Sequence, residues 1–518
     1  MKRLLIFALV IGLSVGMALP AKSASDKPKR GGTLIMAIRK DLTVMNPLVR
    51  TLSTDKAIRQ LMYESLLMLD EKGNIKPRLA KSWDISNDGK TYTFHLRKGV
   101  KYHNGQEMTA KDAKFAMDYT LNPTNGAYGR SRLNLVKGVE ASGKYTLKVS
   151  LREPSTTFLS VLIDIQSFSI IPSESVKEGF VKPDSYPPGT GPFRFAGWKP
   201  KQQIVFERND SYWGQKPYLD RVVLRPIRNG TVRFTALRSG DVDIAERTPY
   251  EWVNQVLSGK IKGIYLSEAV HGAYRQIVFN VANPPFNNRK LRLALIHALN
   301  KKEILQAAFY GFGDPADQKY PKGHTWYIKG VPSPQYDPAK AKRLLKESGY
   351  KGEVIEVTLP QAATIETGMT MIQAQLKRIG MNIKLNIIDY GAHRDRLRRG
   401  ELTFDLMGTN YKADPTTTYR TETACEPDLK KRASNWSGYC NKEMDAQLEK
   451  LEIERDPKKR KAILRQVLIT RNQDVPIVPV GFVPRFFSVR GYVKGFKTDF
   501  NGAFVWSNGG LSHAWLDK

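Results

Sequence analysis

Acidic residues are scarce in this chain of 518 residues. Asp and Glu number 50 against 82 Lys and Arg, which gives a formal net charge of +32 at pH 7. Such an excess normally suggests nucleic acid or an anionic surface as a partner. The basic residues, however, are spread along the whole chain without a long Lys/Arg tail. We therefore expect a solvated basic surface and no nucleic-acid partner. A protein that binds DNA or anionic vesicles through its charge is the alternative.

Cysteine is almost absent, since the chain has only Cys425 and Cys440. Outside the cytoplasm this pair could form a disulfide that closes a local loop and stabilises the fold by roughly 3 kcal/mol. Two free buried thiols are the alternative. Because no cluster of His, Cys and carboxylate residues is visible in the sequence, we expect no metal site and no cofactor.

Long apolar runs are also missing after the first two dozen residues. The one long run, residues 4–19, follows Lys2 and Arg3 and precedes small residues up to Ala24. This pattern is typical of a secretory signal peptide, which we place at residues 1–24. No cysteine lies near the expected cleavage site, so we expect no lipid anchor. No later run reaches 18 apolar residues, and we expect a mature chain that is soluble.

The common catalytic motifs are absent. The seven histidines are scattered, and the sequence has no HExxH, no paired CxxC, no GxSxG and no P-loop. The Gly-x-Gly in PPGTGPF is followed by Pro192, where a phosphate-binding helix would need a backbone N–H. We therefore expect a protein that is not an enzyme. A secreted hydrolase with a triad dispersed along the sequence is a distant alternative.

The periodicity of apolar residues predicts an α/β fold. Residues 55–68 have a helical period, and Thr109 with Asp112 has the pattern of a capping box. Asp337 and Pro338 begin a predicted helix that ends near Gly349. Strands and helices alternate along the chain after Tyr274. This alternation predicts a partly parallel sheet.

The segment FDLMGTNYKADP, residues 404–415, combines a short strand with a polar loop. After Gly408 come Asn410, Tyr411 and Asp414, and Pro415 biases Asp414 towards an extended conformation. Open α/β sheets place ligands at the C-terminal ends of their strands. A carboxylate beside an aromatic ring at such a place could bind a cationic group of a small ligand. An exposed turn is the alternative, since Asp-Pro pairs are common in loops.

Nine segments, taken in order, resemble one known family. They are GGTLIMAIRKDLTVMNP, AKSWDISNDGKTYTFHLRKGVKYHNGQEMTAKDAKFAMD, GTGPFRF, YWGQKPYLD, SGDVDIAE, KLRLALIHALNKKEIL, YDPAKAKRLLKESGY, SNWSGYCNKEMDAQL and DVPIVPV. Through these segments nearly all of the mature chain resembles the extracytoplasmic solute-binding proteins of the peptide/nickel/opine class of ABC importers.

The resemblance implies a two-lobed periplasmic-binding-protein fold with hinged mixed sheets and an extra inserted domain. Lobe I would comprise residues 25–60, 190–270 and 486–518, the inserted domain residues 61–189, and lobe II residues 271–485. Two crossover strands, near Tyr274 and Val483, would join the lobes. The lobes would close by a hinge motion around a short peptide, an opine-like conjugate or a metal chelate. The closed monomer would then dock on a membrane permease.

The resemblance also implies residue roles. In peptide-binding relatives an aspartate three residues after an aromatic pairs with the ligand's α-amino group, and Tyr411 with Asp414 matches that spacing. Here Asp414 is itself followed by Pro415. Either the loop is shortened, or Asp414 is the second acid of the usual pattern and the first is missing. Further ligand contacts are expected at Thr51, Leu52, Ser53, Asn280 and Phe482.

Overall fold

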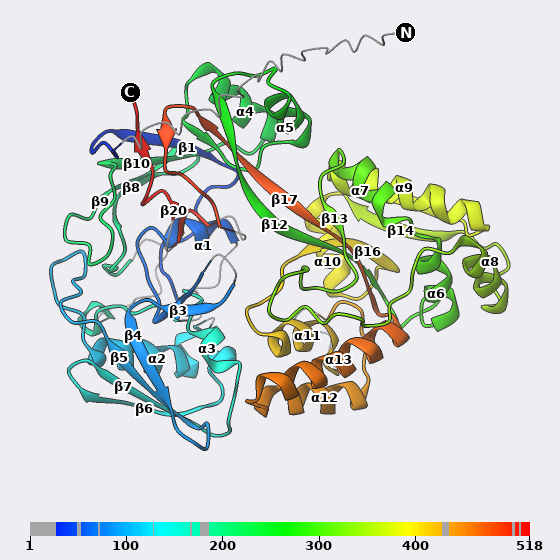
Figure 1. Ribbon diagram of the computed structural model, residues 1–518, viewed down its shortest axis with the longest axis horizontal. Helices are drawn as coiled ribbons and strands as arrows, with labels where there is room; N and C mark the ends of the chain where they lie inside the picture. Colours follow the sequence, from blue (N-terminus) through cyan, green and yellow to red (C-terminus); the bar gives the residue numbers. More distant parts are fainter. Residues whose placement is uncertain are drawn as a thin grey trace, which may run out of the picture.

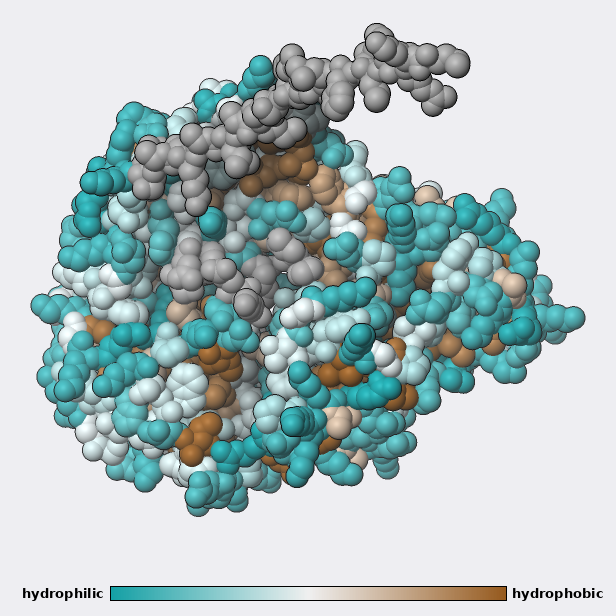
Figure 2. All heavy atoms as spheres, viewed as in Figure 1, coloured by the Kyte–Doolittle hydropathy of each residue, from teal (hydrophilic) through white to brown (hydrophobic). Residues whose placement is uncertain are grey.

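The chain folds into two lobes that are joined by two long strands, as the computed structural model shows (Figure 1). The structure describes residues 27–48, 53–70, 73–127, 129–165, 168–176, 186–426, 435–499, 503–506 and 509–518. Figure 2 shows a mainly hydrophilic face, with apolar residues concentrated along the junction between the lobes and beside the crossing strands. The α/β class and the two-lobed architecture predicted from the sequence are confirmed.

The main sheet runs through both lobes in the order β16-β12-β17-β11-β1-β10-β9-β8, with β13 also paired to β17. Its strands are β1 (Thr33–Ile38), β8 (Phe193–Lys199), β9 (Gln203–Arg208), β10 (Arg221–Pro226), β11 (Ile244–Ala245), β12 (Ile264–Phe279), β13 (Asp314–Pro315), β16 (Phe404–Thr409) and β17 (Ile477–Arg490). β1 is parallel to β10 and β11, whereas the other neighbours are antiparallel. Lobe I therefore mixes both pairings, and β12 and β17 carry the sheet into lobe II.

β12 and β17 are the two strands that cross from one lobe to the other. Tyr274 is paired with Phe482 in the ladder, and their rings lie 5.2 Å apart. The register shifts between Ala269 and Ala273 and again at Arg275, so the ladder is irregular on both sides of this aromatic pair. The crossover positions predicted near Tyr274 and Val483 lie at this point. An interrupted ladder between two continuous strands is a suitable hinge.

The region predicted as an inserted domain holds a four-stranded antiparallel sheet in the order β4-β5-β7-β6, which the hairpin β2-β3 precedes along the chain. Its elements are β2 (Leu67–Leu69), β3 (Ile75–Pro77), β4 (Ala80–Ile85), β5 (Thr91–Leu96), α2 (Ala110–Leu121), β6 (Val136–Gly143), β7 (Thr146–Leu151) and α3 (Phe158–Val161). The capping box predicted at Thr109 and Asp112 begins α2. One continuous hydrophobic core joins Leu34 of β1 to Phe94 and Leu147 of this sheet. The inserted domain and lobe I are thus packed as one body.

The helix predicted over residues 55–68 is shorter in the structure. α1 spans Ser53–Arg59, and the chain then turns so that Glu64 is fully buried. Its carboxylate accepts hydrogen bonds from Arg78, Thr190, Tyr212 and Trp213. These partners are distant in sequence, so the buried carboxylate overrides the local helical period.

Lobe II places helices around the end of the main sheet and around the parallel pair β14 (Ile355–Pro360) and β15 (Ile383–Ile388). Its helices are α6 (Arg289–Ala298), α7 (Lys301–Phe309), α8 (Pro338–Glu347), α9 (Ala363–Ile379), α10 (Tyr390–Arg398), α11 (Pro415–Thr423), α12 (Lys442–Ile453) and α13 (Pro457–Asp474), while α4 (Gly230–Ser239) and α5 (Tyr250–Leu257) belong to lobe I. Asp337 caps α8 with Pro338 in its first turn, as predicted. Among the described residues, no helix is long and apolar enough to cross a membrane.

Candidate ligand-binding site

A cavity of about 790 Å³ lies between the two lobes. One wall comes from α1, the inserted domain and the hinge side of lobe I, and the other comes from residues 410–413, α11 and the end of α12. Ligand pockets in proteins measure about 300–1,000 Å³. The cavity therefore has the volume for a small organic molecule and opens at the boundary that a hinge motion would close.

The loop singled out from the sequence forms part of this cavity. Asn410, Tyr411, Lys412 and Ala413 all line it. The Tyr411 ring lies 5.2 Å from the ring of Tyr320, which supports it from inside lobe II. Two of the predicted ligand-binding residues, Asn410 and Tyr411, are therefore placed where they can contact a ligand.

Asp414 lies outside the lining of this cavity. It is buried at the N-terminus of α11, where one carboxylate oxygen accepts a hydrogen bond from the Thr416 N–H at 2.8 Å. The other oxygen accepts from the Arg460 guanidinium, also at 2.8 Å, and both side chains of this ion pair are buried. A ligand amine would have to displace Arg460. The geometry therefore argues against a direct amine contact in this conformation, while the expected role of Asp414 in ligand binding stays a prediction.

Hydrogen bonds to both of its backbone polar groups fix the position of Lys412. Its N–H donates to the Thr418 hydroxyl at 2.9 Å, and its carbonyl accepts from the Tyr320 hydroxyl at 2.9 Å. The same Thr418 hydroxyl donates to the Asp414 carbonyl. Because both backbone groups are fixed, the Lys412 side chain projects from a rigid loop into the cleft, where it stays accessible to solvent although protein surrounds it on both sides.

The other predicted contacts are dispersed. Asn280 donates through its side chain to the Gly400 carbonyl at 2.8 Å and holds the far end of β12. Phe482 is buried in a small cluster with Tyr274 and Ala316. Both residues lie away from the cavity lining. Thr51 and Leu52 are outside the described residues, and Ser53 is described only as the first residue of α1.

Three basic side chains and one acid converge on the cleft from opposite lobes. Lys56 of α1 and Arg132 both bind Asp164, at 2.9 and 2.8 Å, and all three line the cavity together with Lys412. Withdrawal from bulk water between the lobes, then the charges of Arg132 and Lys56, lower the pKa of Lys412 to about 8. Lys56 and Arg132 thus share one carboxylate, and Lys412 adds a third positive charge to this part of the cavity.

A second group of basic side chains lines the cavity beside the hinge. Glu246 accepts from the Arg39 N–H at 2.8 Å and lies 3.7 Å from the Arg247 guanidinium. Burial and then the charge of Arg39 lower the pKa of Arg247 to about 10, and burial followed by Arg247 lowers that of Arg485 to about 9. Arg247 also has a φ of +52°, a strained backbone of the kind that is enriched at functional sites.

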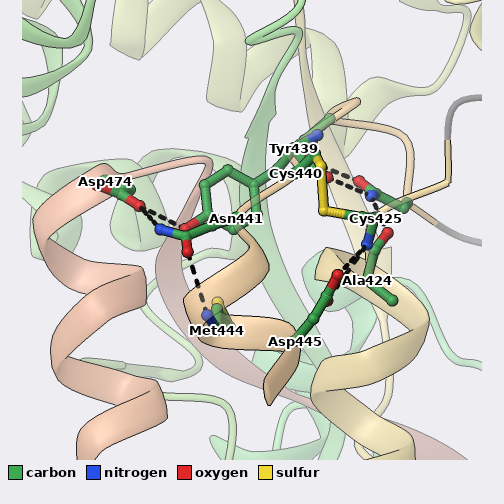
Figure 3. Close-up of a disulfide and its surroundings, with 10 residues drawn as sticks. Ala424, Cys425, Tyr439, Cys440, Asn441, Met444, Asp445 and Asp474 are labelled. Atoms are coloured by element: carbon green, nitrogen blue, oxygen red, sulfur yellow. Dashed lines mark hydrogen bonds between the residues drawn. A yellow bond between two sulfur atoms is a disulfide. The ribbon is translucent and has the colours of Figure 1, made fainter. Parts of the chain in front are cut away.

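The disulfide predicted between Cys425 and Cys440 is present and connects the end of α11 to the start of α12 (Figure 3). The Cys425 N–H donates to the Asp445 carboxylate, and Asn441 caps α12 by accepting from the Met444 N–H. Cys425 itself lines the cavity. The bridge therefore fixes the lobe II wall of the site.

Two contacts close the cleft at its rim. Thr156 of the inserted domain donates to the Glu452 carbonyl of α12, through its N–H at 2.9 Å and its hydroxyl at 2.8 Å. Arg455 donates to the carbonyl of Asn87 at 2.8 Å. These bonds join the inserted domain to lobe II. Hydrogen bonds therefore link the two bodies at the rim of the cleft in this structure.

Sequence reasoning missed the basic residues of the cleft. Lys412 lies in the loop that the sequence indicates, but the prediction names Asp414 and not Lys412 as the charged ligand contact. Lys56 and Arg132 have no local signal, because only the fold brings them opposite lobe II. No group of three or more His, Cys, Asp or Glu side chains that could hold a metal ion occurs in the described parts of the chain.

A family model described as bacterial extracellular solute-binding proteins, family 5, middle region, matches residues 74–426. The chain belongs to this family. Family 5 proteins bind extracytoplasmic solutes, and the resemblance found in the sequence is confirmed. The chain is 30% identical to the dipeptide-binding protein of Escherichia coli K12 over 454 residues, covering 82% of this chain and 84% of the relative.

Two solved structures extend the comparison of this family 5 chain. One is the periplasmic binding protein DppA from Helicobacter pylori in complex with the peptide STSA, with a TM-score of 0.80 and 28% identity over 95% of this chain and 99% of the other. The second is AgaA from A. tumefacien R10 in complex with agropinic acid, with a TM-score of 0.79 and 25% identity over 94% of this chain and 99% of the other.

Proposed function

We propose that this chain is the periplasmic solute-binding component of an ABC importer. It encloses a short peptide or an amino-acid-derived compound between its lobes and delivers it to a membrane permease. The observation that carries this proposal is the cavity of about 790 Å³ between two bodies joined by β12 and β17. The dipeptide-binding relative and the peptide complex of DppA support the ligand class.

The proposal assigns binding rather than chemistry to the site. The chain would act without a cofactor, as a monomer, and not as an enzyme. The signal peptide at residues 1–24 would direct it to the periplasm without a lipid anchor. The division into lobe I, inserted domain and lobe II at residues 61, 190, 271 and 486 belongs to the same proposal. Intact mass of the secreted protein tests the cleavage site and the absence of lipid.

Native mass spectrometry of the secreted chain, followed by calorimetry with dialanine, trialanine and glutathione, tests the ligand class. We expect a co-purified small molecule or a binding signal, together with a smaller radius of gyration in solution scattering when the ligand is added. An absence of both a bound compound and ligand-induced compaction with all three peptides would contradict the proposal.

A pair of matched variants tests whether the ligand binds in the cleft. Ala413 lines the cavity, and Ala413→Trp should fill part of it and weaken binding at least tenfold. Ala363 is exposed at the start of α9, and Ala363→Trp should bind as the unchanged protein does. Equal affinity of both variants would move the site away from the cavity.

An acidic amino-acid conjugate of the opine type is a second candidate ligand. The basic side chains of Arg39, Arg247 and Arg485 beside the hinge favour it. AgaA, a structural neighbour, is in complex with agropinic acid. Calorimetry with agropinic acid against trialanine would separate the two candidates.

A further inference from the structure

We propose that the ligand carries an acidic oxyanion group, which Lys412 binds from lobe II while Lys56 and Arg132 face it from the opposite body. This inference rests on the proposed function, because it names the chemistry of the solute that the cleft takes. The oxyanion could be a carboxylate or a phosphate, and the two share the geometry of negatively charged oxygens that ammonium and guanidinium groups recognise.

The first step of the argument is the freedom of Lys412. No hydrogen bond or ion pair joins its ammonium group to another side chain in the described parts of the chain. Its backbone is fixed by Thr418 and Tyr320, so the side chain alone has room to adjust. A cation on a rigid loop, aimed into a cavity and left without a partner, is arranged for an anion from outside the protein.

The second step is the balance of charge around Lys412. Asp164 is already shared by Lys56 and Arg132, whose side chains are each about one-third exposed to the cleft. Lys319 adds a further positive charge from inside lobe II, although Glu422 is its direct partner. The cations around this point therefore outnumber the carboxylates, and an anionic group would relieve their mutual repulsion.

The third step concerns the acids that an amine would need. Asp414 is paired with Arg460, and Glu246 lies beside Arg39 and Arg247. Glu452 binds Arg420 on the cavity wall at 2.9 Å. Glu426 and Asp499, which also line the cavity, have contacts of their own. A ligand ammonium would have to compete with the contacts that these acids already make, whereas a ligand acid meets Lys412 without displacing a protein group.

The position of the three cations also links recognition to closure. Lys412 belongs to lobe II, whereas Lys56 and Arg132 belong to the body formed by lobe I and the inserted domain. Without an anion these cations repel one another across the cleft. An oxyanion between them turns that repulsion into attraction, so binding and lobe closure stabilise each other.

The experiment uses two probes on the mature full chain, on Lys412→Gln and on the control Lys342→Gln, which alters an exposed lysine of α8 away from the cavity. Inorganic phosphate and acetate are first compared with sodium chloride at equal ionic strength in thermal unfolding. We expect phosphate or acetate to raise the melting temperature of the unchanged chain and of Lys342→Gln more than chloride does. For Lys412→Gln the three anions should have the same effect on the melting temperature. The more effective anion indicates which oxyanion is preferred.

Calorimetry with trialanine, trialanine amide and acetyl-trialanine is the second probe. Loss of a charge-assisted contact should weaken binding on the order of tenfold. We expect this loss when the unchanged chain binds trialanine amide in place of trialanine, and also when Lys412→Gln binds trialanine. Acetyl-trialanine should bind the unchanged chain within about threefold of trialanine. Equal effects of phosphate, acetate and chloride, or equal affinity of trialanine and its amide, would overturn the acidic-group inference while leaving the proposed function in place. An oxyanion response that depends on Lys412 without binding of any peptide would support the oxyanion site and reject the peptide class.

Discussion

Replacing Asp414 with alanine removes two structural contacts at once. The carboxylate caps α11 through the Thr416 N–H and pairs with the buried guanidinium of Arg460. The variant therefore leaves a buried charge without its partner and a helix without its cap. If Asp414 is structural, as this geometry indicates, the damage appears as lost stability of lobe II rather than as lost selectivity for an amine.

The magnitude follows from the two contacts. Breaking a buried ion pair by removing one partner costs about 3–5 kcal/mol, and losing an N-cap costs about 1 kcal/mol. Arg460 also lies 3.4 Å from the Thr416 hydroxyl and 4.8 Å from the Trp326 ring centre. These contacts remain in the variant, so we expect the low end of the ion-pair cost, about 3 kcal/mol, and the loss of the cap, which together give about 4 kcal/mol for Asp414→Ala. Asp414→Asn retains a capping oxygen and should lose about 1 kcal/mol less.

Native-state hydrogen exchange read by mass spectrometry measures this loss where it occurs. A chain of several domains need not unfold in one two-state step, so amides of α11 and α13 report the local free energy better than a global melt does. We expect faster exchange in both helices of Asp414→Ala and unchanged exchange in α2 of the inserted domain. The double variant Asp414→Ala/Arg460→Met should be less destabilised than the sum of the single variants, because it removes the stranded charge together with its partner.

One pattern would refute the reasoning. If Asp414→Ala kept the exchange rates of α11 and α13 within a factor of about three and lost binding of trialanine but not of acetyl-trialanine, Asp414 would be an amine ligand. Arg460 would then have to release the carboxylate when the ligand enters.

Three further predictions concern closure, pH and the disulfide. Arg455→Ala removes a bond to the carbonyl of Asn87 and should raise the open population about fivefold, measured as a larger radius of gyration, since such a bond contributes about 1 kcal/mol. Burial and the neighbouring cations lower the pKa of Lys412 to about 8, so an acidic ligand should bind most tightly well below pH 8 and progressively less tightly as the pH rises through and above that value. Calorimetry from pH 6 to 10 on the unchanged chain and Lys412→Gln checks this. The Cys425→Ser/Cys440→Ser variant opens a loop of 15 residues and should lose about 3 kcal/mol in the exchange of α11, with no change in α2.

Local chemistry explains which parts of the fold could be predicted from the sequence. The capping box at Thr109 and the Asp337–Pro338 start of α8 depend only on neighbouring residues, and both occur as expected. The helix expected to continue to residue 68 ends at Arg59, because Glu64 enters a buried network with partners such as Arg78 and Thr190. Partners that distant leave no periodic signal.

The same distinction between neighbouring and distant partners explains which parts of the site could be predicted. The loop at residues 410–414 could be found because a strand, a glycine and polar residues follow one another along the sequence. The role of Asp414 could not, since its partner Arg460 lies 46 residues later on α13. Lys56 and Arg132 reach the cleft only through the packing of the inserted domain on lobe I.

The continuity of β12 and β17 across both lobes has a practical consequence for dissecting the protein. A cut at the hinge would divide two paired strands and leave their unpaired N–H and C=O groups on each fragment, together with apolar residues such as Tyr274 and Phe482. Exposed strand edges of this kind promote association between chains. Lobe II expressed alone should therefore aggregate.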